Sequence, residues 1–360
     1  MSKKAKGQAM DDIYISKKRR RSDDFIVEIP EEEFLLPEPP EDYEPPKKKR
    51  KRKKHRFLRF IATALALVFL LTSGFIFMFA AASGYTRNDL ERNEYISSLQ
   101  LKSSPFVTNI LLLGVDGSAD SSSRSDTMIL VSVDYKHAKI KLTSFLRDSW
   151  VEIPSKGKKA KLNAACSYGG PQLVADTIEY NFGVDIDHFV MVDFEMFTNI
   201  IDSLGGVNVE VTKKEADFIN RTTRQNVDYG DSVHLNGEEA LVYCRIRKLD
   251  SDYMRTYRQR KVITALINQA KTAGISKLLE TMREVFPLIQ TDMSPAEITG
   301  LAYKAGVGML AFDIEQNRVP IDEHMTPKTI NGQWVESLDI EATKDYLIEY
   351  IYTDNIEIEE

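Results

Sequence analysis

The sequence contains few of the residues on which many active sites depend. It has only two cysteines and five scattered histidines among 360 residues. Two cysteines cannot form a disulfide framework in a chain of this size, although Cys166 and Cys244 could form a single bond. A zinc site would need histidines at a ligand spacing that is absent here. The H-E-x-x-H, nucleophile-elbow and kinase patterns are also missing, which argues against the enzyme classes that they mark.

Positive charge is scarce after the first 56 residues. Residues 57–360 hold 31 of the 48 basic and 42 of the 54 acidic residues, so their net charge is −11. Nucleic-acid binding depends on a positive surface, and we therefore expect no nucleic-acid partner. The sequence also lacks internal repeats and a long linker. One large domain is the simplest division of the residues that follow the N-terminal region.

Residues 60–82, FIATALALVFLLTSGFIFMFAAA, are 23 uncharged and mostly apolar residues. As a helix they would be about 34 Å long, which is enough to cross a bilayer. Eight consecutive basic residues, 47–54, directly precede this run. The positive-inside rule then predicts a cytoplasmic N-terminus, and the basic run suits contact with anionic membrane lipid. A cleavable signal peptide is the alternative to an uncleaved anchor.

These features predict a single-pass type II protein of the cell membrane, with most of the chain outside the cell. Six of the 13 prolines lie between Pro30 and Pro46, interleaved with acidic residues, as is typical of a disordered tail. The expected parts are, in chain order, a cytoplasmic tail (1–56), a transmembrane signal anchor (57–83), a juxtamembrane connector (84–104) and an extracellular domain (105–360).

The most concentrated basic segment lies in the expected outer domain. Residues 245–260, RIRKLDSDYMRTYRQR, contain five arginines. The segment LVYCRIR, 241–247, alternates like a strand, which would place Arg245 and Arg247 on one face. Two neighbouring guanidinium groups on one face form a wall that can bind an anion.

A helix is predicted after this strand, with Ser251 or Asp252 as its N-cap. At about 100° per residue, Arg255 and Gln259 fall on its apolar stripe and Arg258 lies on the flank. A core-facing arginine needs an anion, because burying an unpaired charge costs several kcal/mol. The planar guanidinium matches phosphate oxygens in pairs. A structural ion-pair network with Asp250, Asp252 and other carboxylates is the alternative reading.

Three apolar segments, 109–115, 127–133 and 139–145, are predicted to form an antiparallel meander. Four charged residues would then gather at one edge of that sheet: Asp116, Arg124, Asp126 and Arg147. Two carboxylates beside arginines suit a magnesium ion that bridges phosphate oxygens. Salt bridges between loop and strand are the alternative.

The rest of the chain carries weaker signals. Residues 171–182 read as a helix, and residues 187–211 as strand, helix, Gly-Gly turn and strand. Gly205-Gly206 is predicted to end a helix, because no phosphate-loop pattern surrounds it. The histidines His188 and His234 are interpreted as structural. Residues 271–360 contain helical segments and a strand-like stretch, 313–321, but no recognisable motif.

Seven segments, in this order, resemble the LytR-CpsA-Psr family of cell-envelope proteins: NILLLGVD, RSDTMILVSVD, SFLRDSWVEIP, KLNAACSYGG, DSLGGVNVEV, LNGEEALVYCRIR and SDYMRTYRQR. The resemblance covers about residues 105–270. It implies an α/β fold in which helices flank a central mixed β-sheet, behind one N-terminal transmembrane helix. It also implies a long hydrophobic pocket for a polyprenyl chain.

The resemblance further implies a membrane-anchored phosphotransferase. Such enzymes move an anionic or secondary cell-wall glycopolymer, of teichoic-acid or capsule type, from a polyprenyl-pyrophosphate carrier to peptidoglycan and form a phosphodiester. The magnesium-linked carboxylates of the family correspond to Asp116 and Asp126. Its pyrophosphate-binding groups correspond to Arg124, Arg147, Lys161, Arg245, Arg247, Arg255 and Gln259, with Arg258 adjacent.

The implied catalytic groups are Arg147, Arg245, Arg247 and Asp252, and either Asp252 or Asp116 could deprotonate the acceptor hydroxyl. Three other functions stay open on the sequence. A hydrolase could cleave the same pyrophosphate with water. A membrane-bound transcriptional attenuator would need the short tail to act on DNA, although no helix-turn-helix pattern is present there. A non-catalytic module could bind polyprenyl phosphate or the cell wall.

Overall fold

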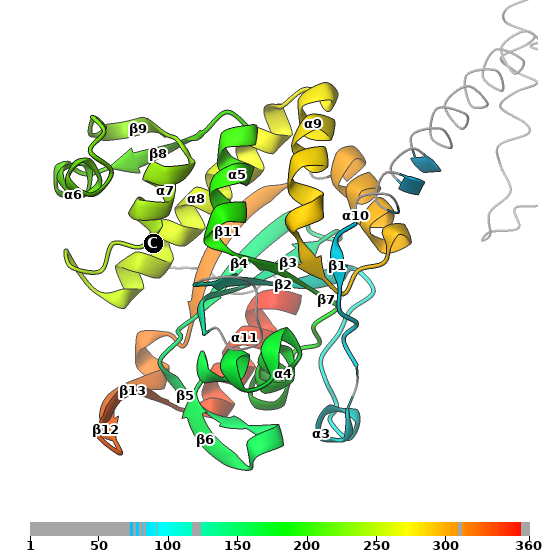
Figure 1. Ribbon diagram of the computed structural model, residues 1–360. Helices are drawn as coiled ribbons and strands as arrows, with labels where there is room; N and C mark the ends of the chain where they lie inside the picture. The colour runs from blue at the N-terminus through cyan, green and yellow to red at the C-terminus, as the bar shows by residue number, and fades with distance from the viewer. Residues whose placement is uncertain are drawn as a thin grey trace, which may run out of the picture. The chain divides into compact units, whose positions relative to one another are not determined.

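A mixed β-sheet with helices on both faces forms the centre of the computed structural model (Figure 1). In the part of the chain that the structure describes, this sheet has seven strands in the order β1-β10-β7-β2-β3-β4-β11. Their bounds are β1 Thr86–Arg87, β10 Gln290–Thr291, β7 His188–Val192, β2 Val107–Val115, β3 Ser125–Asp134, β4 Lys139–Phe145 and β11 Asp313–Val319. Strands β2, β3 and β4 pair antiparallel in chain order, which confirms the predicted meander. Strands β7 and β11 extend it by parallel pairing.

The structure describes residues 73–74, 77–78, 81, 84–91, 93–116, 124–308 and 312–353. The predicted tail, 1–56, lies outside these residues, as does nearly all of the predicted anchor, 57–83. No helix within the described ranges is long and apolar enough to cross a membrane.

One face of the sheet is covered by α4 (Ala164–Phe182) and α11 (Ile340–Tyr352). Alternate residues of β2, among them Leu111 and Leu113, are fully buried against these helices. This follows from the strand period of two, and each such side chain stabilises the fold by about 1.5–3 kcal/mol. Helix α4 is kinked at Gly170, whose positive φ of 65° suits a residue without a Cβ.

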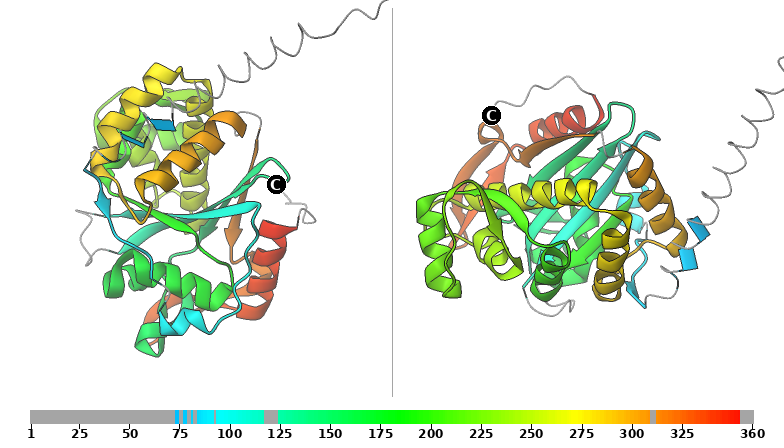
Figure 2. Two further views of the ribbon diagram at one scale, coloured as in Figure 1. Left: turned by 90° about the vertical axis from the view of Figure 1, so that its right-hand side faces the viewer. Right: turned by 90° about the horizontal axis from the view of Figure 1, so that it is seen from above.

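The other face carries α5 (Phe194–Ser203), α8 (Asp252–Thr272), α9 (Ile275–Val285) and α10 (Pro295–Gly308), as the two views in Figure 2 show. Ile263 and Ile267 of α8 pack against the β3–β4 part of the sheet. The central strands are covered less completely on this face. Ile110 and Leu112 of β2 and Val190 of β7 remain partly exposed.

Smaller elements surround this centre. Strands β8 (Val207–Val211) and β9 (Gly230–Leu235) form a two-stranded antiparallel sheet, which packs with α6 (Lys213–Thr223) and α7 (Gly237–Cys244). A second sheet has the order β12-β13-β5-β6. The remaining bounds are β12 Met325–Ile330, β13 Gln333–Leu338, β5 Ser149–Ile153, β6 Lys158–Lys161, α3 Glu94–Ser97, and the 3₁₀ turns Pro154–Lys156, Phe286–Leu288 and Asp322–His324.

The predicted strand at 241–247 is wrong, because most of this segment belongs to helix α7. Asn236 and Glu239 form a capping box, in which each side chain accepts a hydrogen bond from the other's backbone N–H at 3.0 and 2.8 Å. Ala240, Tyr243 and Cys244 are then buried on one helical face. An alternation of seven residues also fits a strand, but the Asn-x-x-Glu capping signal at 236–239 marks the start of a helix.

Other local predictions are confirmed. The segment 187–211 forms β7, α5, a turn and β8, and Gly205 and Gly206 both have positive φ angles in that turn. Helix α8 begins after Ser251, whose side chain accepts a hydrogen bond from the Met254 N–H at 3.4 Å. Cys166 and Cys244 are both buried and both free, so they do not form a disulfide.

Candidate functional site

The two charged clusters predicted from distant parts of the sequence meet at one edge of the central sheet. Asp116 follows the end of β2, Asp126 lies at the start of β3, and Arg147 follows the end of β4. The antiparallel register brings these three strand ends together. The end of α7 and the start of α8 reach the same edge, since their arginines contact Asp116 and Asp126.

Asp126 connects arginines from three segments. Its Oδ1 accepts a hydrogen bond from Arg147 Nη1 at 3.0 Å, and its Oδ2 lies 3.4 Å from Arg247 Nη2. Its backbone oxygen accepts a hydrogen bond from Arg255 Nη2 at 3.2 Å. The arginines on either side of the site are therefore held by one residue of β3.

Asp252 forms a second link across the site. Its carboxylate lies 3.5 Å from Arg147 Nη2 and 3.0 Å from Arg255 Nη2. Burial raises the pKa of Asp252, although Arg255 and Arg147 oppose that effect. Burial also lowers the pKa of Arg255, which only Asp252 and other carboxylates counteract. A carboxylate with a raised pKa beside two arginines is suited to accept a proton.

Lys161 joins the cluster through Asp148. The Lys161 Nζ lies 2.6 Å from Asp148 Oδ1, and Arg147 Nε lies 3.4 Å from Asp148 Oδ2. Sequence reasoning did not include Asp148 in the site, although it directly follows Arg147. Its role is clear only from the pairing of β5 with β6, which brings Lys161 back to the start of β5.

Arg245 lies at the rim of the site. Its Nη2 is 3.9 Å from Asp116 Oδ2, and its guanidinium lies over the Phe194 ring with 4.2 Å to the centroid. Both charged side chains are more than half exposed. An aromatic face orients a guanidinium without neutralising it, so Arg245 keeps its charge available to a ligand. Sequence reasoning missed Phe194, because no local pattern links it to Arg245.

The cluster has polar atoms and charge left over. Arg255 Nε and Gln259 Oε1 are buried and have no hydrogen-bond partner among the described residues. Leaving such a group unpaired costs about 1–3 kcal/mol. Five basic residues contact four carboxylates, a surplus of one positive charge: Arg147, Lys161, Arg245, Arg247 and Arg255 against Asp116, Asp126, Asp148 and Asp252. The surplus charge and the unused Arg255 donor suit an anionic ligand, whereas the Gln259 oxygen is an acceptor and suits a donor such as a hydroxyl group.

Arg124 is exposed and forms no ion pair with any residue that the structure describes. It stands directly after residues 117–123, which lie outside the described ranges. Its predicted contact with a phosphate therefore stays a prediction.

The structure contradicts the prediction that Arg258 lies beside the bound pyrophosphate. Its side chain is 2% exposed, and its guanidinium is bound by Glu215, by Asp250 and by the Ile246 carbonyl oxygen. Burial lowers the pKa of Arg258, but hydrogen bonds and charges from Glu215 and Asp250 outweigh that effect and raise it. The structural ion-pair reading is right for this residue, because its donors are used inside the protein.

The residues predicted to bind magnesium are open to solvent and already paired. Asp116 and Asp126 are 62% and 38% exposed and lie beside arginines. Among the described residues there is no group of three or more histidine, cysteine, aspartate or glutamate side chains that could hold a metal ion. The donor set fits a magnesium ion whose shell is completed by a ligand and water better than an ion held by the protein alone.

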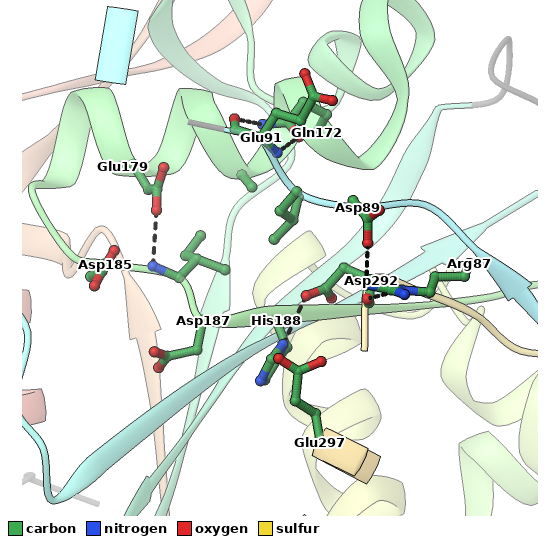
Figure 3. Close-up of a pocket in the computed structure, with 13 residues that line it drawn as sticks. Arg87, Asp89, Glu91, Gln172, Glu179, Asp185, Asp187, His188, Asp292 and Glu297 are labelled. Atoms are coloured by element: carbon green, nitrogen blue, oxygen red, sulfur yellow. Dashed lines mark hydrogen bonds and ion pairs between the residues drawn. The ribbon is translucent and has the colours of Figure 1, made fainter. Parts of the chain in front are cut away.

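A cavity of about 440 Å³ lies near the start of β7, where Asp187 and His188 belong to its lining (Figure 3). Phe194 follows the other end of β7, and the arginine cluster lies there, because Arg245 contacts the Phe194 ring. The charged lining of the cavity is mostly acidic: Asp89, Glu91, Glu179, Asp185, Asp187, Asp292 and Glu297, with Arg87 and His188. His188 Nδ1 donates a hydrogen bond to Asp292 Oδ2 at 2.8 Å. An anionic diphosphate would be repelled by these carboxylates, so the arginine-rich edge is the better site for it.

Comparison with known proteins agrees with this geometry. The sequence profile of the LytR_cpsA_psr family matches residues 74–349. TagU of Halalkalibacterium halodurans, named polyisoprenyl-teichoic acid–peptidoglycan teichoic acid transferase, is 36% identical over 189 residues, 51% of this chain and 60% of that protein. The chain thus spans about three fifths of that relative. Bacillus subtilis TagU, with the same name, is 32% identical over 249 residues, 68% of this chain and 76% of the relative.

Two solved structures share the fold. The structure titled TagT bound to LI-WTA matches with a TM-score of 0.60 and 26% identity, over 74% of this chain and 99% of TagT. The B. subtilis TagV structure matches with a TM-score of 0.57 and 27% identity, over 69% of this chain and 98% of TagV. Because the family profile matches residues 74–349, most of the sequence, the chain belongs to the LytR_cpsA_psr family.

Proposed function

We propose that this protein is a membrane-anchored phosphotransferase that moves a cell-wall glycopolymer from a polyprenyl-pyrophosphate carrier to peptidoglycan. The observation that carries the proposal is the arginine cluster with its surplus positive charge and the unpartnered Nε of Arg255. Such a site suits a diphosphate. The names of these relatives, polyisoprenyl-teichoic acid–peptidoglycan teichoic acid transferase, support the same reaction and favour a teichoic-acid type of polymer.

The donor diphosphate would replace protein carboxylates as a partner of the arginines. Arg147, Arg247 and Arg255 all contact Asp126 in this structure. Their guanidinium groups need to move only a short distance to bind phosphate oxygens instead. Arg245 and Lys161 would bind from the rim. These groups lower the barrier by neutralising the charge that develops on the transferring and leaving phosphates.

In the proposed reaction, the acceptor hydroxyl oxygen attacks the phosphorus next to the sugar. A new P–O bond forms as the P–O bond to the bridging oxygen breaks, so polyprenyl phosphate leaves and a phosphodiester remains. Asp252 would take the hydroxyl proton, because it contacts Arg147 and burial raises its pKa. Asp116 is more exposed and pairs with Arg245, which makes it the weaker candidate for this role.

A magnesium ion belongs to the same proposal. Asp116 and Asp126 would hold it together with phosphate oxygens, and it would supply further neutralisation of the diphosphate. The partly exposed apolar residues of the central sheet, Ile110, Leu112 and Val190, offer a surface for the polyprenyl chain. An anchor at 57–83 with the site outside the cell would place the protein where lipid carrier and peptidoglycan meet.

The test supplies purified full-length protein in lipid vesicles with a defined polyprenyl-pyrophosphate glycan, magnesium and peptidoglycan oligomers. Mass spectrometry should detect a phosphodiester between glycan and peptidoglycan. A wild-type protein that releases only the free phosphorylated glycan would be a hydrolase. Donor glycans of teichoic-acid and capsule type, compared in parallel, would identify the polymer.

A further inference from the structure

The hairpin formed by β12 and β13 contacts the segment that carries Arg147 and Asp148 at the charged edge of the central sheet, although no sequence motif marks this hairpin. Strand β13 pairs parallel with β5, which places Glu336 opposite Ser149. The Glu336 N–H donates a hydrogen bond to the Asp148 carbonyl oxygen at 3.0 Å. The backbone of Glu336 is thereby attached to the segment that carries Arg147 and Asp148.

The side chain of Glu336 reaches the opposite side of the site. Its Oε1 accepts a hydrogen bond from Tyr253 Oη at 3.1 Å. Tyr253 directly follows Asp252 in the first turn of α8. The Arg318 guanidinium lies over the Tyr253 ring at 4.6 Å from its centroid, and the Met325 sulfur lies 3.6 Å from the Tyr253 hydroxyl. Tyr253 is therefore held on its face and at its hydroxyl.

The buried Glu336 carboxylate is unfavourable for the free energy of folding, so stability alone does not explain it. Glu336 is 8% exposed, and its buried Oε2 has no hydrogen-bond partner among the described residues. Burying a carboxylate with one unsatisfied oxygen is unfavourable, and a neutral pair of similar size would be at least as stable. Burial and the neighbouring Glu336 raise the pKa of Tyr253 to about 12, so its hydroxyl remains a donor at neutral pH.

We propose that Glu336 and Tyr253 form a positioning bridge, which sets the distance between the Arg147–Asp148 segment and the first turn of α8. The same two segments meet inside the site through the 3.5 Å contact of Arg147 with Asp252. The ion pair between Arg147 and Asp252 must break when Arg147 binds the diphosphate. The bridge lies outside the pair and holds Asp252 and Arg255 in place during the exchange.

The inference rests on the proposed function for its catalytic consequence, but the bridge itself is measurable without turnover. The variants are Tyr253→Phe, Glu336→Ala and Glu336→Gln, with Tyr257→Phe as the control. Tyr257 is one helical turn from Tyr253, is 41% exposed and takes no part in the bridge. Hydrogen exchange of full-length protein reports the geometry, and the transfer assay reports kcat and KM for the lipid donor.

We expect Tyr253→Phe and Glu336→Ala to speed amide exchange in residues 252–256 and 333–338, with the rest of the sheet unchanged. Each should lower kcat about tenfold and change the donor KM less than about twofold, because displaced catalytic groups affect the reacting geometry more than binding. The double variant should lose no more than either single variant. Glu336→Gln should keep at least half of the activity, because an amide oxygen can accept the Tyr253 hydrogen bond.

Unchanged exchange and kcat in Tyr253→Phe, equal to those of Tyr257→Phe, would overturn the bridge. Equal loss in Glu336→Gln and Glu336→Ala would overturn it too, since it would assign the carboxylate a direct chemical role. Should the wild-type protein transfer nothing while exchange responds as described, the proposed function fails and the bridge stands.

Discussion

Replacing Arg258 by alanine should destabilise the protein strongly, because this arginine holds three segments together. Its guanidinium contacts Glu215 of α6 at 2.6 Å, the Ile246 carbonyl oxygen at 3.1 Å and Asp250. The Arg258 side chain is 2% exposed and that of Glu215 is 9% exposed. Removing Arg258 leaves Glu215 as an uncompensated buried charge.

Breaking such a buried pair from one side costs about 3–5 kcal/mol. In a domain of this size each kcal/mol lowers Tm by about 2–4 °C, so the expected loss is on the order of 10 °C. Replacing both buried partners, in Glu215→Gln/Arg258→Met, should cost clearly less, because the buried Glu215 charge is removed as well and the Asp250 side chain, 28% exposed, can be hydrated. Arg221→Ala, an exposed arginine of the same helix as Glu215, should stay within about 0.5 kcal/mol of the wild type.

Urea denaturation of purified full-length protein, followed by the fluorescence of Trp150 and Trp334, measures these differences. Binding of inorganic pyrophosphate, measured by calorimetry, provides the complementary readout. A loss of stability below about 1 kcal/mol together with weaker pyrophosphate binding would refute the structural assignment and restore Arg258 to the ligand site.

Three further outcomes are expected. Arg147→Ala and Arg245→Ala should each remove glycan transfer while Tm stays within a few degrees, as checked by the transfer assay and calorimetric scans. In the wild type, the transfer rate should rise with pH through the raised pKa of Asp252, and Asp252→Asn should abolish that rise. Burial lowers the pKa of His188, but the hydrogen bond and the charge of Asp292 outweigh burial, so the pKa is raised overall. Protonated His188 should therefore stabilise the fold below pH 6.5. That contribution disappears as pH increases through the folded pKa, so unfolding of His188→Asn should depend less on pH there.

Local chemistry made much of the fold predictable. The strands 109–115, 127–133 and 139–145 are recognisable because each is an apolar run with a clear end, and their order along the chain favours a meander. Helix α8 was predictable from Ser251 and its apolar stripe, and Asp116, Asp126 and Arg147 from their places at strand ends. The segment before Arg245 was misread as a strand, since seven alternating residues fit a short helix equally well.

By itself, the sequence determined which residues can bind an anion, where the strands end and how charge is divided along the chain. These properties depend on side-chain type and on neighbours within one helical turn or strand. Only the tertiary structure decided which arginines have free charge. Arg258 and Arg255 are three positions apart on α8, yet Glu215 neutralises Arg258 from another helix, whereas Arg255 keeps a buried nitrogen without a partner. The same holds for Glu336, which joins the site through strand pairing with β5 that no local pattern encodes.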